Sequence, residues 1–418
     1  MYRILSADTN KETLMLKACT RHGLLLGTVG LVVFCISCAQ KQVTPNPALL
    51  TQFPAYGAAP IVRVKLSDPS ARSSIRLEAG AAGVFFDGVK HTASDPITLT
   101  RGDDGLIHAS GLGQGAFVEL SPGNSPQSFS LDGRTYRGRL RVYAGSQGWE
   151  VINVVDLEQY VAGVIGWEML RNWPVEALAA QAVASRTYAL FCVQERRQSG
   201  DDWDIDDSTR FQVYGGVGPT ASPNLWRESA NVLQARQMTT GQVLTYHGQG
   251  FKAFFHSTSG GITTSPEAAF DMPGGLEPLN GSDLGTYCKD SPKYQWTLRM
   301  GKGEVNARLI EWKIGVTDLI RVEATRTAPS GHAMTLRLFG RDGKSVDVRA
   351  IDFRSRMALP STSFAAQREP AEWLFTGKGY GHGCGMCQWS AFGMAKSGWR
   401  HERILKAMFP GAAIESLY

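Results

Sequence analysis

The hydrophobic periodicity of the chain changes at Asp156, and this change constrains the fold more than any other feature of the sequence. Before it, from about residue 61 to 155, short alternating or β-branched runs recur between turn residues, which indicates an antiparallel β region. After it, apolar residues recur at three- and four-residue spacing over residues 157–169 and again over residues 172–196, which predicts two helices. Asn172 as cap, with Pro174 in the first turn, is the expected start of the second helix.

Strand-like runs return after the helices, and the chain closes with helical segments. The runs cover residues 211–216, 241–248, 251–257 and 335–348, and two short helices are expected near residues 388–396 and 400–409. We therefore expect an α+β fold, with an N-terminal antiparallel β region followed by a mixed helical and β core and a glycine-rich C-terminal segment. The expected β-rich region is 61–155, and the expected core is 156–418.

The N-terminus predicts export. Lys17 and Arg21 precede an uncharged apolar run, residues 24–37, which is short for a membrane span and suits the core of a signal peptide over residues 1–37. Cys38 follows at once and resembles the lipidated residue of a bacterial lipoprotein, and residues 38–60 then suit a flexible tether. The protein is expected to be lipid-anchored to a bacterial membrane, facing the periplasm or cell wall, and at the outer membrane if the host has two. An uncleaved anchor is the alternative.

The charge balance argues against nucleic acid as the main partner. Removal of residues 1–37 takes away four basic and two acidic residues, so the net charge falls from +5 to +3. Basic residues form no stripe with interleaved aromatics.

Glu168 is the best candidate for a catalytic group. It stands between Trp167 and Met169, in a segment that is expected to pack inward, so desolvation would raise the pKa of its carboxyl and make it a general acid. A solvent-exposed glutamate at a helix end, or one paired with Arg186, is the structural alternative.

The other polar motifs are less specific. Glycine recurs at nearly every second position from residue 377 to 385, but neither dinucleotide nor P-loop spacing is satisfied. His382 inside this run could be a proton carrier, a substrate contact, a metal ligand or a structural hydrogen-bonding group. Ser259 does not fit the nucleophile elbow, so residues 256–261 are more simply a polar loop that contacts substrate.

Three cysteines could form a cross-link or a metal site. Cys384 and Cys387 make a C-x-x-C pair, and a zinc site would need Cys288, His256 or His382 to join them. In an oxidising compartment we favour a disulfide of Cys288 with one of Cys384 and Cys387. No resident cofactor is expected, and zinc is the disfavoured alternative.

Taken together, these segments resemble the stage II sporulation protein D and amidase-enhancer family of bacterial cell-wall proteins. The resemblance covers roughly residues 137–414. The motifs that carry it are YVAGV (160–164), EM (168–169), WPVEAL (173–178), AQAVA (180–184), RTYA (186–189), QVYGG (212–216), HSTSGG (256–261), GYGHG (379–383), GM (385–386) and QW (388–389).

The resemblance implies a peptidoglycan lytic transglycosylase that acts on glycan strands stripped of their stem peptides. One carboxyl, at the position of Glu168, would protonate the oxygen between N-acetylmuramic acid and N-acetylglucosamine and then take the C6 hydroxyl proton, which closes a 1,6-anhydro ring. This differs from the two-carboxylate scheme of ordinary glycosidases. The residues that would hold sugar groups are Arg186, Tyr188, Ser257, Ser259, Tyr380, His382 and Gln388.

The sequence departs from the family at two places. Arg210-Phe211 stand where some members carry a His-Cys pair of a zinc site, and Ala179 stands where many have lysine, so a cation facing the substrate would be missing. The alternative function is a non-catalytic glycan-binding enhancer of a cell-wall amidase. A metal protein using Cys288, Cys384, Cys387 and a histidine is the third, weaker reading.

Overall fold

The computed structural model describes residues 47–67, 73–78, 83–91, 96–121, 128–145, 148–272 and 275–418. The predicted signal peptide and Cys38 lie outside these residues. Among the described residues, no helix is long and apolar enough to cross a membrane.

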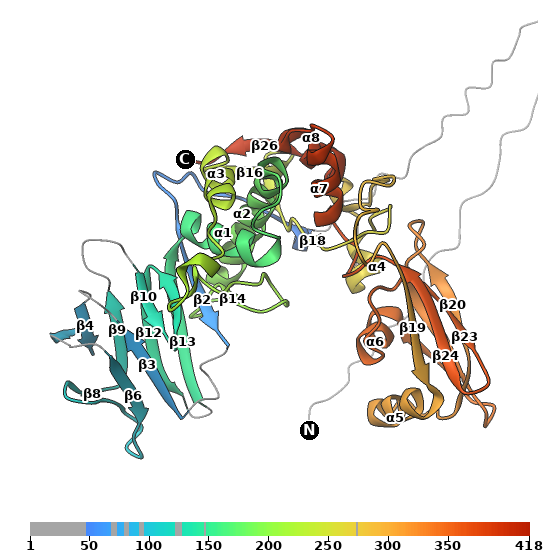
Figure 1. Cartoon of the computed structure of the whole chain (residues 1–418), viewed down its shortest axis with the longest axis horizontal. Helices are drawn as coiled ribbons and strands as arrows, with labels where there is room; N and C mark the ends of the chain where they lie inside the picture. The colour runs from blue at the N-terminus through green and yellow to red at the C-terminus, as the bar shows by residue number, and fades with distance from the viewer. Residues whose placement is uncertain are drawn as a thin grey trace, which may run out of the picture. The chain divides into compact units, whose positions relative to one another are not determined.

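Two seven-stranded sheets form the region before the helices (Figure 1). One runs in the order β15-β11-β10-β3-β6-β7-β8 and the other in the order β14-β2-β13-β12-β9-β4-β5. Their strands are β2 (Ile61–Leu66), β3 (Ser74–Glu78), β4 (Gly83–Phe86), β5 (Val89–His91), β6 (Ile97–Arg101), β7 (Ile107–Ala109), β8 (Gly113–Gly115), β9 (Phe117–Ser121), β10 (Ser128–Leu131), β11 (Arg134–Arg137), β12 (Arg139–Gly145), β13 (Gly148–Asp156), β14 (Ile205–Asp206) and β15 (Gly218–Pro219).

The alternation of buried and more exposed side chains along the strands gives each sheet one face that packs against the core. Along β2, every second residue is buried, as expected for a strand with one face toward a core. The buried residues of both sheets belong to one hydrophobic core, which also includes the helices that follow. The predicted antiparallel β region is confirmed. Two short strands from beyond residue 156 complete its sheets. β14 pairs in parallel with β2, and β15 pairs antiparallel with β11.

The predicted helix pair is confirmed as α1 (Leu157–Glu168) and α2 (Val175–Gln198). Every residue of α2 from Ala177 to Val193 is buried, so this helix is enclosed on all sides rather than amphipathic. Around it pack α1, α3 (Ala230–Met238), α7 (Gln388–Lys396), α8 (His401–Met408) and β16 (Gln242–Tyr246). The N-cap prediction was wrong, because Pro174 occupies that position and no side chain caps the helix.

A separate hydrophobic core lies in residues 295–378. In this part of the chain the sequence pattern predicted only the strands between residues 335 and 348. Its elements are β19 (Gln295–Gly301), α5 (Lys302–Trp312), β20 (Leu319–Thr327), β21 (Ala333–Gly340), β22 (Ser345–Arg349), α6 (Ala350–Arg356), β23 (Phe364–Arg368) and β24 (Glu372–Lys378). They build two three-stranded sheets, β19-β24-β23 and β20-β21-β22. The predicted strands between residues 335 and 348 are confirmed within β21 and β22.

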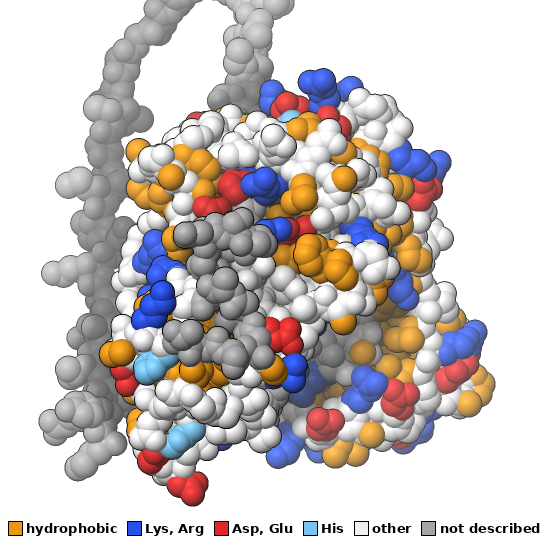
Figure 2. Space-filling view, turned by 60° about the vertical axis from the view of Figure 1, so that its left-hand side comes forward, with side chains coloured by type: hydrophobic (Ala, Val, Ile, Leu, Met, Phe, Trp, Pro, Cys, Tyr) orange, Lys and Arg blue, Asp and Glu red, His pale blue; other side chains and the backbone are white. Residues whose placement is uncertain are grey.

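Short strands and helices complete the structure. A four-stranded sheet has the order β1-β17-β16-β26, formed with β1 (Leu50–Thr51), β17 (Gln249–Phe251) and β26 (Ala413–Ser416), and β18 (Phe255–His256) pairs in parallel with β25 (Met386–Cys387). The helix α4 covers Pro266–Phe270, and single 3-10 turns lie at Pro47–Leu49, Pro223–Leu225 and Glu277–Leu279. The predicted strand over residues 211–216 was wrong, since this segment is irregular. On the face drawn in Figure 2, basic and acidic side chains are interspersed.

Candidate active site

Glu168 is the last residue of α1, and the local sequence sets this end. The strand β13 runs directly into the helix, where the Asp156 carboxylate caps it by accepting the backbone N–H of Glu158 at 2.9 Å. At the other end Met169 is extended, with φ −124° and ψ 160°, so the chain turns away immediately after Glu168. The carboxyl therefore projects from a fixed helix terminus.

Two glycines let another segment lie directly against α1. A Cβ at Gly163 would meet the ring of Tyr214 at 2.6 Å, and one at Gly166 would meet the backbone oxygen of Arg227 at 2.4 Å. Real Cβ atoms do not come this close to other atoms. Glycine at both positions is thus required for residues 212–227 to pack on the helix.

Side-chain hydrogen bonds fix the start of this segment. The Tyr160 hydroxyl donates to Oε1 of Gln212 at 3.0 Å, and Nε2 of Gln212 donates to the Ser185 carbonyl at 3.3 Å. The hydroxyl of Tyr214 donates to Oδ1 of Asn153 at 2.7 Å. Residues 212–214 are therefore held between α1, α2 and β13.

This placement brings two donors to the carboxyl of Glu168. The backbone N–H of Val213 donates to Oε1 at 2.7 Å, and Nε2 of Gln388, the first residue of α7, lies 3.5 Å from Oε2. The same Gln388 amide lies 3.3 Å from Oε1 of Gln181 in α2. Three segments that are distant in sequence therefore meet at Glu168.

The surroundings of Glu168 favour its neutral form. Burial raises the pKa of the carboxyl above its ordinary value, and the hydrogen bonds from Val213 and Gln388, which lower it, only partly offset this effect. Among the residues that the structure describes, no basic side chain forms an ion pair with Glu168. The residue nevertheless keeps part of its surface exposed. A partly exposed carboxyl with a raised pKa keeps its proton to higher pH than an ordinary glutamate, as a general acid must.

Arg186 lies in the interior and pairs with another glutamate. Its side chain is 0% exposed, and its Nε and Nη2 donate to the two carboxylate oxygens of Glu158, each at 2.7 Å. Nη1 donates to the Gln242 carbonyl at 3.0 Å. The predicted contact of Arg186 with a sugar is corrected to a structural ion pair, because no part of the guanidinium is free to meet a substrate. The alternative pairing of Arg186 with Glu168 is excluded by the same contacts.

Tyr188 is almost fully buried, at 6% exposed, but lines a cavity of about 390 Å³. The other lining residues are Glu195, Arg196, Ser199, Asp201, Arg210, Phe211 and Lys252. Phe211 is two residues before Val213, so this cavity opens beside the segment that contacts Glu168. Tyr188 borders this cavity and is not one of the hydrogen-bond partners of Glu168, which are Val213 and Gln388.

The predicted polar loop at residues 256–261 splits into exposed and buried positions. Ser257 is partly exposed, whereas Ser259 is 3% exposed and donates its backbone N–H to the Cys387 sulfur at 3.2 Å. Tyr380 is 48% exposed, and its backbone pairs with Thr258 through a bridge. Ser259 also borders a cavity of about 350 Å³ that Lys378 lines from β24.

His382 is held as a neutral imidazole by its neighbours. Its Nε2 lies 2.8 Å from the Phe255 carbonyl and must donate there, so its Nδ1 is the acceptor for the Cys384 N–H at 3.1 Å. Burial lowers the pKa of His382 to about 4. Both ring nitrogens are occupied by the backbone, so this histidine orders the glycine-rich segment and is not placed to carry protons or bind a sugar.

The four described cysteines, Cys192, Cys288, Cys384 and Cys387, are buried free thiols. The backbone of Cys384 binds His256 and His382, and burial raises the pKa of its thiol. The thiols of Cys288 and Cys387 both contact Ser259, and the Cys387 thiol lowers the pKa of Cys288. Within the described parts of the chain, none of these cysteines belongs to a group of three potential metal ligands.

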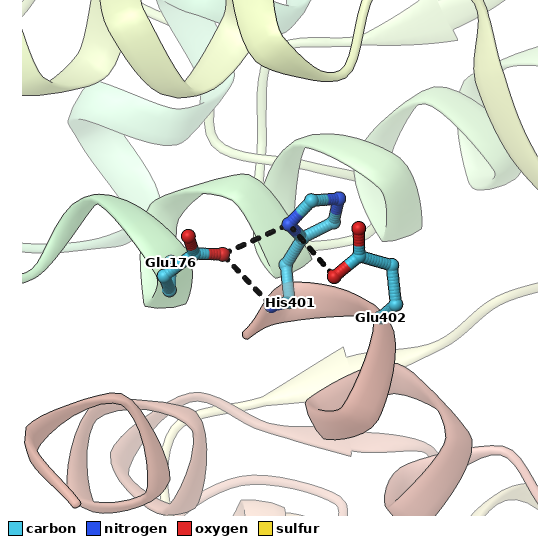
Figure 3. Close-up of side chains that lie close together, drawn as sticks. All are labelled: Glu176, His401 and Glu402. Carbon is cyan, nitrogen blue, oxygen red and sulfur yellow. Dashed lines mark hydrogen bonds and ion pairs between the residues drawn. The ribbon is translucent and has the colours of Figure 1, made fainter. Parts of the chain in front are cut away.

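One group of three side chains could share a cation, namely Glu176, His401 and Glu402 (Figure 3). Nδ1 of His401 lies 2.9 Å from Oε2 of Glu176 and 3.5 Å from Oε2 of Glu402, and the His401 backbone N–H donates to the same Glu176 oxygen at 2.8 Å. Nε2 of His401 lies 3.3 Å from the Gln242 side chain. These contacts explain the cluster as a link between the first turns of α2 and α8, and no step of catalysis needs a metal there.

The two departures from the family pattern have structural explanations. Ala179 is 0% exposed within α2, so this position faces the packed interior and not a substrate. Arg210 is exposed and lies 4.0 Å from Asp206, while Phe211 packs edge-on against Trp203. The side chain at position 179 carries no charge, and its effect on substrate binding stays a prediction.

The structure adds partners for Glu168 that residue types could not reveal. The Val213 donor is a backbone group, and Gln181 contributes only through Gln388. The QVYGG motif at residues 212–216 was the available signal, because it contains Val213, whose backbone N–H binds Glu168.

Comparison with known proteins gives three kinds of relative. Residues 145–246 match the family model described as stage II sporulation protein. Stage II sporulation protein D of Bacillus subtilis is 31% identical over 267 residues, which cover 62% of this chain and 74% of the relative. An uncharacterized protein of Brachyspira hyodysenteriae is 29% identical over 370 residues, 86% of this chain and 94% of the relative. The amidase enhancer of Bacillus subtilis is 27% identical over 356 residues, 72% of this chain and 47% of the relative.

Proposed function

Because the chain belongs to the family of stage II sporulation protein D, we propose that it is a peptidoglycan lytic transglycosylase with Glu168 as its acid and base. Membership of this family supports a role at the cell wall. The observation that carries the finer proposal is the environment of Glu168, a partly exposed carboxyl with a pKa raised by burial and no cationic partner among the described residues.

The two oxygens of Glu168 have different neighbours, and this difference suits a proton donor. The Val213 N–H donates to Oε1 at 2.7 Å, whereas the Gln388 amide is 3.5 Å from Oε2, so Oε1 is the more strongly bound acceptor and the proton of the neutral acid belongs on Oε2. Oε2 would protonate the glycosidic oxygen between N-acetylmuramic acid and N-acetylglucosamine. The resulting carboxylate is stabilised by Val213 and Gln388 and then takes the proton of the C6 hydroxyl as the 1,6-anhydro ring closes.

This scheme needs one carboxyl because the attacking hydroxyl belongs to the substrate. An inverting hydrolase needs a second carboxylate to activate water, about 6.5 to 9.5 Å from the first. The groups hydrogen-bonded to Glu168 are a backbone amide and a glutamine, and neither is a second acid. Intramolecular attack consumes no water and leaves a product without a reducing end.

Glycan binding is proposed for the polar surfaces near the site. Ser257 and Tyr380 are accessible, and the cavity beside Phe211 offers Tyr188, Lys252 and charged side chains. A stripped strand carries hydroxyl, acetamido and lactyl carboxylate groups, which such a mixture of aromatic, hydroxyl and basic groups can bind.

A second candidate function is a non-catalytic enhancer of a cell-wall amidase. It is favoured by the similarity to a protein named amidase enhancer, of which this chain covers 47%. In this case the polar surfaces would bind glycan, and an amidase would be the partner.

Export and lipid anchoring through Cys38 are part of the same proposal, because peptidoglycan lies outside the cytoplasm. The support is the leader sequence alone. Metabolic labelling with palmitate in a bacterial host tests it. Label on the wild type and none on Cys38→Ala supports the anchor, and unlabelled wild-type protein rejects it.

The experiment that separates the two functions uses glycan strands stripped by an amidase beforehand. Mass spectrometry of the digest distinguishes anhydro-muramic ends from reducing ends, which are heavier by one water. Anhydro ends support the transglycosylase. Intact strands, together with a faster purified amidase in the presence of the protein, would instead establish the enhancer.

A further inference from the structure

Two buried cysteines lie together beneath the candidate site. Cys288 and Cys387 are each 0% exposed, and the neighbouring Cys387 thiol lowers the pKa of Cys288. Ser259 contacts both sulfurs, its backbone N–H lying 3.2 Å from Cys387 Sγ and its hydroxyl 3.6 Å from Cys288 Sγ. The two sulfurs therefore share one small polar space.

The geometry points to a disulfide between Cys288 and Cys387 in the oxidised protein. The sequence leaves Cys384 and Cys387 as equal partners for Cys288, and the contacts distinguish them. The sulfur of Cys387 contacts Ser259, which also contacts Cys288, and accepts the Ser390 N–H at 3.3 Å, whereas Cys384 contacts His256 and His382 through its backbone. A metal site would need further ligands, and within the described residues no third histidine, cysteine or carboxylate joins this pair.

The chemistry is thiol–disulfide exchange with a small or protein disulfide as the oxidant. The Cys288 thiolate attacks the oxidant, forms a mixed disulfide and expels one thiolate. The Cys387 thiolate then attacks the Cys288 sulfur, forms the new bond and expels the second thiolate. The protein loses two protons and two electrons, and the oxidant is reduced to two thiols. Because both sulfurs are buried, the exchange takes place while the chain folds.

The cross-link would stabilise the support of the candidate site. Cys387 is the N-cap of α7, and the next residue is Gln388, whose amide reaches Glu168. Cys288 belongs to the turn at residues 285–290. A bond between them would join this turn to the start of α7, beside Ser259, which contacts both sulfurs. This bond does not depend on whether the protein cleaves glycan.

The test is to refold the purified protein in a glutathione redox buffer, block free thiols and map the unreduced tryptic peptides. Trypsin releases Cys288 in a peptide that ends at Lys289, while Cys384 and Cys387 share the peptide 379–396. The variants Cys384→Ser and Cys387→Ser therefore identify the partner. We expect the cross-link in the wild type and in Cys384→Ser, and no cross-link in Cys387→Ser.

A second measurement uses only proteins that keep both Cys288 and Cys387. The oxidised wild type and oxidised Cys384→Ser should each unfold at a temperature higher by about 5 °C or more than their reduced forms, because the bond closes a long loop. Blocked Cys288 and Cys387 after oxidative refolding, a cross-link that survives Cys387→Ser, or bound zinc at one equivalent would each overturn the proposal.

Discussion

The backbone N–H of Val213 donates a 2.7 Å hydrogen bond to Oε1 of Glu168, although 45 residues separate them in the chain. This contact exists because Gly163 and Gly166 leave α1 bare on the side where residues 212–227 pack. The carboxyl therefore has one oxygen held as an acceptor and the other available to carry a proton. Arg186 is kept away from this carboxyl by its ion pair with Glu158.

The first prediction concerns pH. Since Glu168 must start protonated and burial raises its pKa, kcat/KM should fall at alkaline pH through a pKa above that of an ordinary glutamate. Gln388→Met removes a hydrogen bond that lowers this pKa, so its alkaline limb should move to higher pH. Profiles of initial rate against pH check this, and a limb that moves to lower pH would contradict it.

The second prediction is that Glu168→Gln stabilises the protein. A carboxyl whose pKa is higher in the folded than in the unfolded state binds its proton more tightly when folded, so above that pKa its ionisation costs stability. Glutamine does not ionise, so the variant does not have this free-energy cost. Thermal unfolding should show a higher Tm for the variant at pH 7, and the difference should shrink as the pH falls toward the ordinary glutamate pKa. A lower Tm at pH 7 would contradict the assigned environment.

The third prediction uses glycine positions in helices. Glycine to alanine normally stabilises a helix by up to about 1 kcal/mol, and Gly303→Ala in α5, where a Cβ meets no atom within 4 Å, should do so. Gly166→Ala should instead destabilise by about 1 to 3 kcal/mol, because its Cβ would meet a backbone oxygen at 2.4 Å. Urea titrations of both variants check this opposite sign. Stabilisation by Gly166→Ala would show that residues 212–227 do not pack there.

The fourth prediction assigns Arg186 to stability. Arg186→Met leaves the Glu158 carboxylate buried without its partner and should cost about 3 to 5 kcal/mol of unfolding free energy. In the double variant with Glu158→Gln, much of this loss should be recovered. Chemical denaturation measures both. If Arg186→Met kept full stability and only raised KM, the residue would be a substrate contact after all.

Much of the fold follows from residue patterns that have a physical cause. Alternation predicted the strands before residue 156, three- and four-residue spacing predicted α1 and α2, and two short C-terminal helices were expected where α7 and α8 lie. The run at 211–216 has the β-branched and aromatic composition of a strand, yet its backbone forms no strand ladder: the Val213 N–H donates to the Glu168 side chain and the Tyr214 N–H to the Asp207 carbonyl. Composition cannot distinguish these two environments because both are buried. The second core in residues 295–378 was missed since its helices are short and its strands carry many exposed residues.

The candidate site was predictable at its centre and less so around it. Glu168 follows from its apolar flanks, but its partners are a backbone amide and a glutamine 220 residues away. Arg186 and His382 match family positions, and their burial and contacts give them structural roles that a motif alone cannot reveal.

The most direct measurement is the rate at which wild type and Glu168→Gln form anhydro-muramic ends from stripped glycan strands, with Glu311→Gln, an exposed glutamate of α5, as the matched control. With circular dichroism showing that all three are folded, Glu168→Gln should lose about 100- to 10,000-fold in kcat/KM and Glu311→Gln should match the wild type. Equal rates for the wild type and Glu168→Gln would remove Glu168 from the mechanism.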